Sequence, residues 1–191
     1  MIVLGGASRT GKGLISQELM VLLGIPYMSI DPIKMAISKS IPSYKLNTNG
    51  TSVAVSDEMW PFISALILNL VETNVSYIIE GEILPRHVFE LANVHDVRVS
   101  SCFVGYKDIS VEEKISQVRA NSGYPNDWTS NLADSELRGL IKEGVQYSEY
   151  LYDECQTYGV RYIDFSESFE IGRKATLKCL FDDFQRWGRS R

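Results

Sequence analysis

The sequence predicts an α/β domain in which a five-stranded parallel sheet carries helices on both faces. Short apolar segments rich in Val, Ile, Tyr and Phe alternate with longer segments whose apolar residues recur at helical spacing, as in successive strand–helix–strand units. A glycine-rich segment joins the first strand to the first helix. The chain has 191 residues, of which 45% are hydrophobic and 23% charged. This is the size of one ordinary domain, so residues 1–191 are interpreted as a single unit.

The element boundaries follow from apolar periodicity and from stop signals such as Gly24, which ends the first helix just before Pro26. Asp31 stands close to a helix N-cap, because Pro32 suits a first helical turn. Residues 41–57 mix turn formers with scattered apolar side chains, so we expect a loop or small insertion there. The predicted elements are strand 2–4, helix 14–23, strand 27–30, a helix after Pro32, helix 57–74, strand 77–79, a short helix after Pro85, strand 97–104, helix 110–121, a loop at 122–132, a long helix from about 134 to Gly159, strand 160–164 and a helix at about 169–187.

The charge balance disfavours nucleic-acid binding. Lys and Arg total 19 against 24 Asp and Glu, and no block of basic residues offsets the formal net charge of −5. The longest apolar stretch, residues 59–71, is interrupted by polar residues and is shorter than the roughly 18 residues of a membrane span. The N-terminus has no basic segment or cleavage pattern typical of a secretory signal. We therefore expect a cytoplasmic protein with no nucleic-acid or membrane partner.

The cysteines give no sign of a metal or redox site. Cys102, Cys155 and Cys179 are far apart in the sequence, with no Cys-x-x-Cys pair and no Cys/His spacing suited to zinc. We expect reduced, mostly buried thiols without a functional role.

The glycine-rich segment matches G-x-x-x-x-G-K, a loop whose backbone N–H groups wrap a phosphate at a helix N-terminus. Its position between an apolar strand and an amphipathic helix is the context that this mechanism needs, although a plain glycine-rich turn remains the alternative. The lysine adds a positive charge for the outer phosphates. The predicted phosphate-binding residues are Gly6, Ala7, Ser8, Arg9, Thr10, Gly11, Lys12 and Gly13.

Gly13 departs from the common pattern, because many such loops have Ser or Thr there to ligate Mg²⁺. Direct metal ligation by the loop is therefore not expected. Mg²⁺, if used, would be held by phosphate oxygens, water and carboxylates.

Acidic residues follow most of the other predicted strands. In open parallel sheets, ligands bind beyond the carboxyl ends of the strands. Phosphoryl transfer to a hydroxyl needs one carboxylate to orient the acceptor or take its proton, and another to hold the hydrated metal. Asp31 suits the first role and Glu80 the second, unless Asp31 only caps its helix and Glu80 only pairs with an arginine. The remaining acidic residues of this set are Glu82, Asp108 and Asp164.

Arginine is the residue expected to close over the transferring group. Arg119 is the first candidate, because it ends a helix just before a Gly- and Pro-containing loop that could act as a lid. Arg9 and Arg138 are alternatives, and Arg86 is a candidate contact of the acceptor. His87 and His95 have no ligand-like spacing, so we expect both on the surface.

These motifs resemble those of the small P-loop kinases, a superfamily that includes adenylate, shikimate and 2-phosphoglycerate kinases and chloramphenicol phosphotransferase. The similarity rests on the phosphate loop, on Asp31 at the end of the second strand, and on the Ile78-Ile79-Glu80 strand. The layout is most similar to chloramphenicol phosphotransferase, in which the corresponding Asp is the proposed base.

The resemblance implies a three-layer P-loop NTPase fold with strand order 2-3-1-4-5. It also implies use of ATP and Mg²⁺, an acceptor site formed partly by residues 32–57, a lid at about 120–133, and residues 164–169 near the adenine. It leaves the acceptor undetermined. Lys34, Lys39 and Lys45 are the cations of 32–57, so an anionic or a neutral hydroxyl compound fits equally.

Three functional hypotheses follow. The first is an ATP-dependent phosphotransferase that moves the γ-phosphoryl group to a small hydroxyl-bearing acceptor through Lys12, Asp31, Glu80 and Arg119. The second is a nucleoside monophosphate kinase. The third is a nucleotide-binding regulator without catalysis, which Gly13 supports.

Overall fold

The computed structural model describes residues 1–121 and 128–188. They form a five-stranded sheet in the order β2-β3-β1-β4-β5, in which every pairing is parallel. This confirms the predicted fold and strand order. The strands are β1 (Ile2–Gly6), β2 (Tyr27–Ser29), β3 (Ile78–Gly81), β4 (Ser100–Gly105) and β5 (Tyr162–Asp164). The helices are α1 (Lys12–Leu23), α2 (Ile30–Ser40), α3 (Ser52–Glu72), α4 (Pro85–Asn93), α5 (Val111–Ala120), α6 (Asp134–Tyr158) and α7 (Phe169–Gly188), with 3-10 turns η1 (Pro42–Tyr44) and η2 (Trp128–Asn131).

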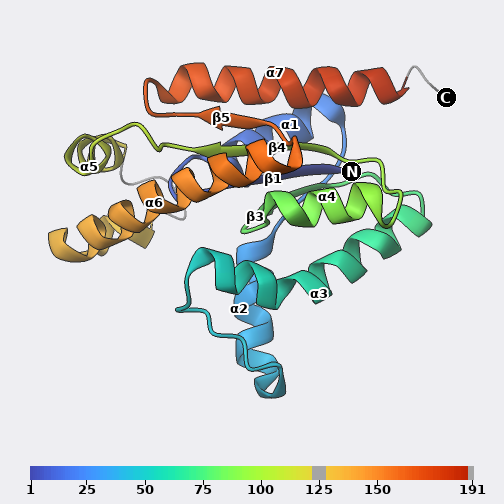
Figure 1. Cartoon of the computed structure of the whole chain (residues 1–191), viewed down its shortest axis with the longest axis horizontal. Helices are drawn as coiled ribbons and strands as arrows, with labels where there is room; N and C mark the ends of the chain where they lie inside the picture. The colour runs from blue at the N-terminus through green and yellow to red at the C-terminus, as the bar shows by residue number, and fades with distance from the viewer. Residues whose placement is uncertain (122–127, 189–191) are drawn as a thin grey trace.

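Two apolar layers enclose the sheet, because successive side chains of a strand point to opposite faces. Ile2 and Leu4 of β1 pack against α1 and α7, whereas Val3 packs in the cluster that includes α3, α4 and α6. Figure 1 shows α1 and α7 on one side of the sheet and α3, α4 and α6 on the other. The central strand β1 thus carries the phosphate-loop sequence out of a buried sheet core.

The start of α3 differs from the prediction, which placed residues 41–57 in a loop. The helix begins at Ser52, where the Thr51 hydroxyl accepts a hydrogen bond from the Ala54 N–H at 3.3 Å. Thr is a favoured N-cap residue. The preceding Asn-, Thr- and Gly-rich stretch obscured the spacing of Val55 and Met59, both of which are buried.

Helix α3 has 21 residues, and its most apolar 18-residue window has a mean hydropathy of 1.2, enough by length and composition to cross a membrane. Of that window, 28% is buried. The predicted apolar stretch was shorter. Length and composition alone are weak evidence for a span, because core helices meet the same test and α3 contributes Met59, Ile63 and Ile67 to the core.

Two further element boundaries differ from the prediction. The predicted strand 97–104 begins at Ser100, because only from there does the backbone pair with β1. Helix α2 begins at Ile30, so Asp31 lies inside the first turn and makes no side-chain cap.

Of the predicted lid, residues 122–127 lie outside the described residues, and the remainder includes the end of α5 and η2.

Candidate phosphate-binding and acceptor site

The phosphate loop runs from the end of β1 to the start of α1 and is fixed by its own backbone. Ala7 N–H donates to Val104 O of β4 at 3.0 Å, and the buried Thr10 hydroxyl donates to Ala7 O at 2.8 Å. Gly11 has φ 76°, and a Cβ there would lie 2.6 Å from the Phe169 ring. Glycine is therefore required at this turn. The first-turn N–H groups of α1 are left at the loop, where an anion binds favourably.

Lys12 folds back over the loop that precedes it. Its Nζ donates to Gly6 O at 3.0 Å and to Ala7 O at 2.8 Å. The ammonium group is therefore held over the loop itself, within reach of any phosphate that the loop amides bind.

Glu80 lies at the carboxyl end of β3, beside this loop, with only 7% of its surface exposed. Burial raises the pKa of the Glu80 carboxyl, while Lys12 and a hydrogen bond from Ser29 lower it and the nearby Asp31 raises it. A Cβ on Gly13 would lie 4.0 Å from Glu80 Oε1. The carboxylate thus borders the position where other loops carry a hydroxyl ligand, and Lys12, Gly13 and Asp31 lie near it.

This donor set fits Mg²⁺ that keeps most of its water. The described residues contain no group of three or more His, Cys, Asp or Glu side chains that would form a complete metal cage. Mg²⁺ is commonly held by one or two carboxylates together with substrate phosphates and water. A single buried carboxylate next to a phosphate loop suits that mode of binding.

Asp31 belongs to a network that the sequence did not reveal. Its side chain is 67% exposed, and its Oδ1 lies 3.3 Å from Lys34 Nζ. Lys34 also donates to Glu82 Oε2 at 2.8 Å, and Ser52 of α3 donates to Glu82 Oε1 at 3.2 Å. Lys34 and Glu82 are 48 residues apart, so only the fold could show the pairing.

Arg119 does not contact the phosphate loop through its described hydrogen bonds. Its guanidinium donates to Ser130 O, Leu132 O and Asp134 Oδ1 at 3.3, 2.9 and 3.0 Å. These contacts join the end of α5 to η2, to the residues that follow it and to the first residue of α6. A role over a transferring phosphate requires the guanidinium to leave these partners, so it stays a prediction. The alternative Arg138 pairs with Glu112 on the surface.

Lys114 of α5 is a residue that sequence reasoning missed. It is 4% exposed, and its Nζ lies 4.3 Å from the centre of the Tyr106 ring. Burial, together with repulsion from Arg9 of the phosphate loop, lowers the pKa of Lys114 to about 8, against an opposing effect of Asp164. A signal was present, since Lys114 shares the helical stripe of Val111 and Val118.

The loop after β5 lies against the phosphate loop, next to the segment that follows β4. Asp164 accepts hydrogen bonds from Lys107 N–H, Tyr162 Oη–H and Ser166 N–H at 3.1, 2.9 and 2.8 Å. Phe169 packs on Gly11. Of the residues that the resemblance places near the adenine, Phe169 therefore adjoins the phosphate loop.

His87 is buried, contrary to the expectation of a surface position, whereas His95 is exposed. His87 stacks on Trp60 with ring centres 4.3 Å apart, and its Nδ1 accepts from Leu84 N–H. Its Nε2 therefore donates to Asp57 Oδ1, at 3.0 Å. Burial lowers the pKa of His87, so the imidazole is neutral. His87 lies in α4, whose buried residues also include Val88 and Leu91, so its position in the helix and not its residue type decides its burial.

Arg86 joins α3, α4 and α6 near the same edge of the sheet. Its guanidinium binds both oxygens of Asp57 at 2.7 Å, and it also bonds Tyr150 and Glu154. The predicted acceptor contact is thus already paired with carboxylates.

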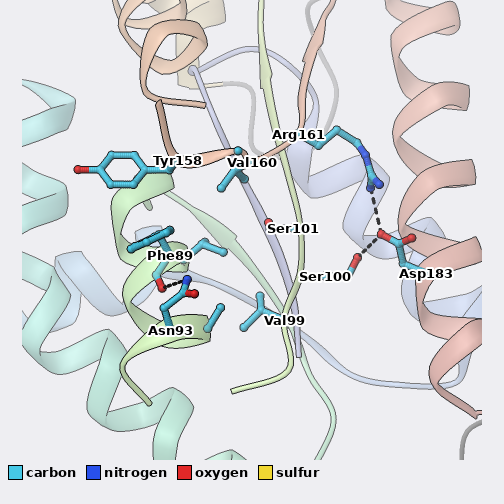
Figure 2. A pocket seen from close by; sticks show the side chains of 12 residues that line it. Phe89, Asn93, Val99, Ser100, Ser101, Tyr158, Val160, Arg161 and Asp183 are labelled. Atoms are coloured by element: carbon cyan, nitrogen blue, oxygen red, sulfur yellow. Dashed lines mark hydrogen bonds and ion pairs between the residues drawn. The ribbon is translucent and has the colours of Figure 1, made fainter. Parts of the chain in front are cut away.

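A pocket of about 550 Å³ opens elsewhere, at the amino ends of β4 and β5. Figure 2 shows Phe89 and Tyr158 on one side of it and Arg161, paired with Asp183, on the other. Ligands of open parallel sheets bind at the opposite, carboxyl ends. This pocket is therefore separate from the candidate site.

Comparisons with known proteins show the fold. No protein-family model and no curated protein sequence matches the chain. A gluconokinase from Sinorhizobium meliloti 1021 is 15% identical, with a TM-score of 0.57, and the match covers 100% of this chain and 97% of that one. Shikimate kinase from Bacteroides thetaiotaomicron is 13% identical, with a TM-score of 0.53, over 94% of this chain and 97% of that one. The chain thus has the fold of the small P-loop kinases.

Proposed function

We propose that this protein is a cytoplasmic, ATP-dependent phosphotransferase that moves the γ-phosphoryl group to a small hydroxyl-bearing acceptor. One observation carries the proposal: Lys12 and the loop amides lie beside the buried Glu80 and the exposed Asp31, at the carboxyl edge of the sheet. A loop that only bound phosphate would not need two carboxylates next to it. The kinases with the same fold support the reaction class.

The phosphate loop and Lys12 would bind and orient the phosphate chain. Their N–H groups and ammonium would stabilise the negative charge that accumulates during transfer, which is the main catalytic contribution in this reaction class. Glu80 would hold Mg²⁺ through its water shell, and the bound metal would neutralise charge between the outer phosphates.

Asp31 would orient the acceptor hydroxyl and accept its proton as the oxygen attacks phosphorus. Its exposure leaves room for the acceptor, and Lys34 keeps its carboxylate in place at 3.3 Å. Arg119 would add positive charge after release from its partners on the segment before α6.

The test is a coupled assay of ADP release with Mg·ATP and a panel of hydroxyl compounds and nucleoside monophosphates, with Lys12→Ala as the blank. We expect at least one hydroxyl compound to raise ADP release only with Lys12 intact. Asp31→Asn should then lower turnover by about a hundredfold. Full turnover in Asp31→Asn would contradict the role of Asp31.

A second candidate is a nucleotide-binding regulator without catalysis. Gly13 favours it, because the loop lacks the usual hydroxyl ligand for the metal. Lys12-dependent nucleotide binding with no transfer to any member of the panel would support this second candidate.

A further inference from the structure

The carboxylates around the proposed acceptor site outnumber the cations that pair with them. Asp31 and Glu82 share Lys34, while Asp57 and Glu154 share Arg86. The two groups adjoin, because the hydroxyl of Ser56, which precedes Asp57, donates to Glu82 O at 2.8 Å. Among the described residues, Lys34 and Arg86 are the charged cations that pair with these four carboxylates. His87 adds no charge, since it meets Asp57 as a neutral donor. We call these four carboxylates the acceptor cluster. Together with Lys34 and Arg86 they carry a net negative charge.

Both cations are already committed. Lys34 is 14% exposed and holds carboxylate oxygens at 2.8 and 3.3 Å. Nη2 of Arg86 donates to both oxygens of Asp57, and Nη1 donates to the Tyr150 hydroxyl and to Glu154 Oε1. Hydrogen bonds between an arginine and carboxylates are charge-assisted and strong, and an incoming anion would have to break them. Neither cation is therefore available for a phosphate or carboxylate on the acceptor.

Buried polar atoms in the same region lack partners. Tyr147 is 9% exposed, and its hydroxyl has no hydrogen-bond partner among the described residues. Glu154 Oε2 is likewise buried and unpartnered there, on a side chain 13% exposed. The Tyr147 ring stacks on the Tyr150 ring with centres 6.3 Å apart, and the Tyr150 hydroxyl bonds both Arg86 and Glu154. A buried polar group without a partner is costly, and a ligand that donates hydrogen bonds would remove that cost.

We propose that the acceptor is a hydroxyl compound that carries an amine, and that the acceptor cluster binds the ammonium group while Asp31 receives the hydroxyl. This inference rests on the proposed function, because it takes Asp31 as the base. An ammonium group supplies both the positive charge and the donors that the cluster lacks. An acid or phosphate ester would meet uncompensated carboxylates and be rejected.

Binding tests this inference independently of turnover. Ligand-observed NMR would compare matched sets of amino alcohols, neutral polyols and hydroxy acids, such as glucosamine, glucose and gluconate, on the full chain and on Lys12→Ala. We expect the amines to bind most tightly and the acids least, in both proteins. Glu82→Gln should weaken amine binding about fivefold. Glu72→Gln is the matched control, since it removes the same charge at the far end of α3, about 30 Å away.

Three results would overturn the inference: tighter binding of an acid than of its matched amine, binding of no member of the sets, or unchanged amine binding in Glu82→Gln. Failure of the proposed function looks different. Amines that bind with the expected dependence on Glu82 but never release ADP would contradict catalysis alone, whereas turnover of a hydroxy acid would contradict the amine alone.

Discussion

Lys114 is a buried cation near Arg9 of the phosphate loop, and its burial makes the stability of the protein depend on pH. Its pKa of about 8 is lower than the 10.5 of an ordinary lysine, so the folded protein binds this proton less tightly than the unfolded chain. The contribution of Lys114 to stability therefore rises with pH between about 8 and 10.5.

Lys114→Met should remove that pH dependence. Between pH 7.5 and 9.5, the free energy of unfolding of the wild type should rise by about 2 kcal/mol relative to Lys114→Met, at 1.36 kcal/mol for each pH unit above the folded pKa. Urea unfolding across this range measures the difference. Lys142→Met on the exposed face of α6 is the control, and it should keep the wild-type slope. An unchanged slope in Lys114→Met would mean that Lys114 is not charged and buried as described.

Glu80 has a raised pKa, and the sign of its effect differs between stability and activity. The folded protein holds this proton more tightly than the unfolded chain, so the contribution of Glu80 to stability is lost as pH rises through the raised pKa. Metal binding needs the ionised carboxylate, so activity should instead fall as pH drops through that pKa.

We expect the activity of the wild type to fall, on the acid side of its pH–rate profile, at a pH above the ordinary glutamate pKa of 4.5, because burial is the largest influence on the pKa of Glu80. Glu80→Gln should abolish this acid limb and lower kcat/KM about a hundredfold. A pH–rate profile at subsaturating Mg²⁺, where protons and Mg²⁺ compete for this carboxylate, measures both effects. Should Glu80→Gln retain the acid limb, another group sets it and Glu80 does not hold the metal.

At the scale of elements, the junction between the phosphate loop and α1 can be altered at one position. A Cβ on Gly13 has room, since the nearest described atom is Glu80 Oε1 at 4.0 Å. Gly13→Ser would place a hydroxyl beside that carboxylate. We expect the Mg²⁺ concentration for half-maximal ADP release to fall several-fold, because the hydroxyl adds a ligand of the type that other loops use. Gly13→Ala controls for the change in helix propensity, and equal Mg²⁺ requirements in both variants would contradict the expectation.

Elements whose signals are local could be predicted from the sequence. Helix α1 ends at Gly24 as expected, where φ is 67° and the N–H bonds Met20 O. The start of α3 and the beginning of β4 could not be predicted as well. The Thr51 cap sits among turn formers, and Val97 is buried without pairing in the sheet, so an apolar pattern alone extended the strand too far.

The same contrast between local signals and contacts of distant residues applies to the candidate site. Lys12 begins α1 directly after the phosphate loop and Glu80 lies near the end of β3, so the order of the elements alone predicts that both lie at the same edge of the sheet. Their roles stay predictions. The Arg86–Glu154 pair spans 68 residues, and the burial of Lys114 and His87 depends on neighbours from other elements. Pairings between distant helices depend on side-chain packing, which no local pattern contains.

At the scale of the whole molecule, nucleotide binding should stabilise the fold through the phosphate loop. Mg·ATP at a hundred times its Kd should raise the free energy of unfolding by about 2.7 kcal/mol. Thermal unfolding with and without Mg·ATP measures this gain. Lys12→Ala should lose it, whereas the exposed Lys39→Met on α2 should keep it. Equal gains in all three proteins would place the nucleotide away from the loop.

Phosphorus NMR of the products shows whether the phosphoryl group is transferred to an acceptor hydroxyl. With Mg·ATP and the acceptor that raises ADP release, the wild type should form a phosphate ester in proportion to ADP, and Lys12→Ala should form none. Conversion of ATP to ADP and inorganic phosphate alone, or ester formation that does not depend on Lys12, would contradict the account.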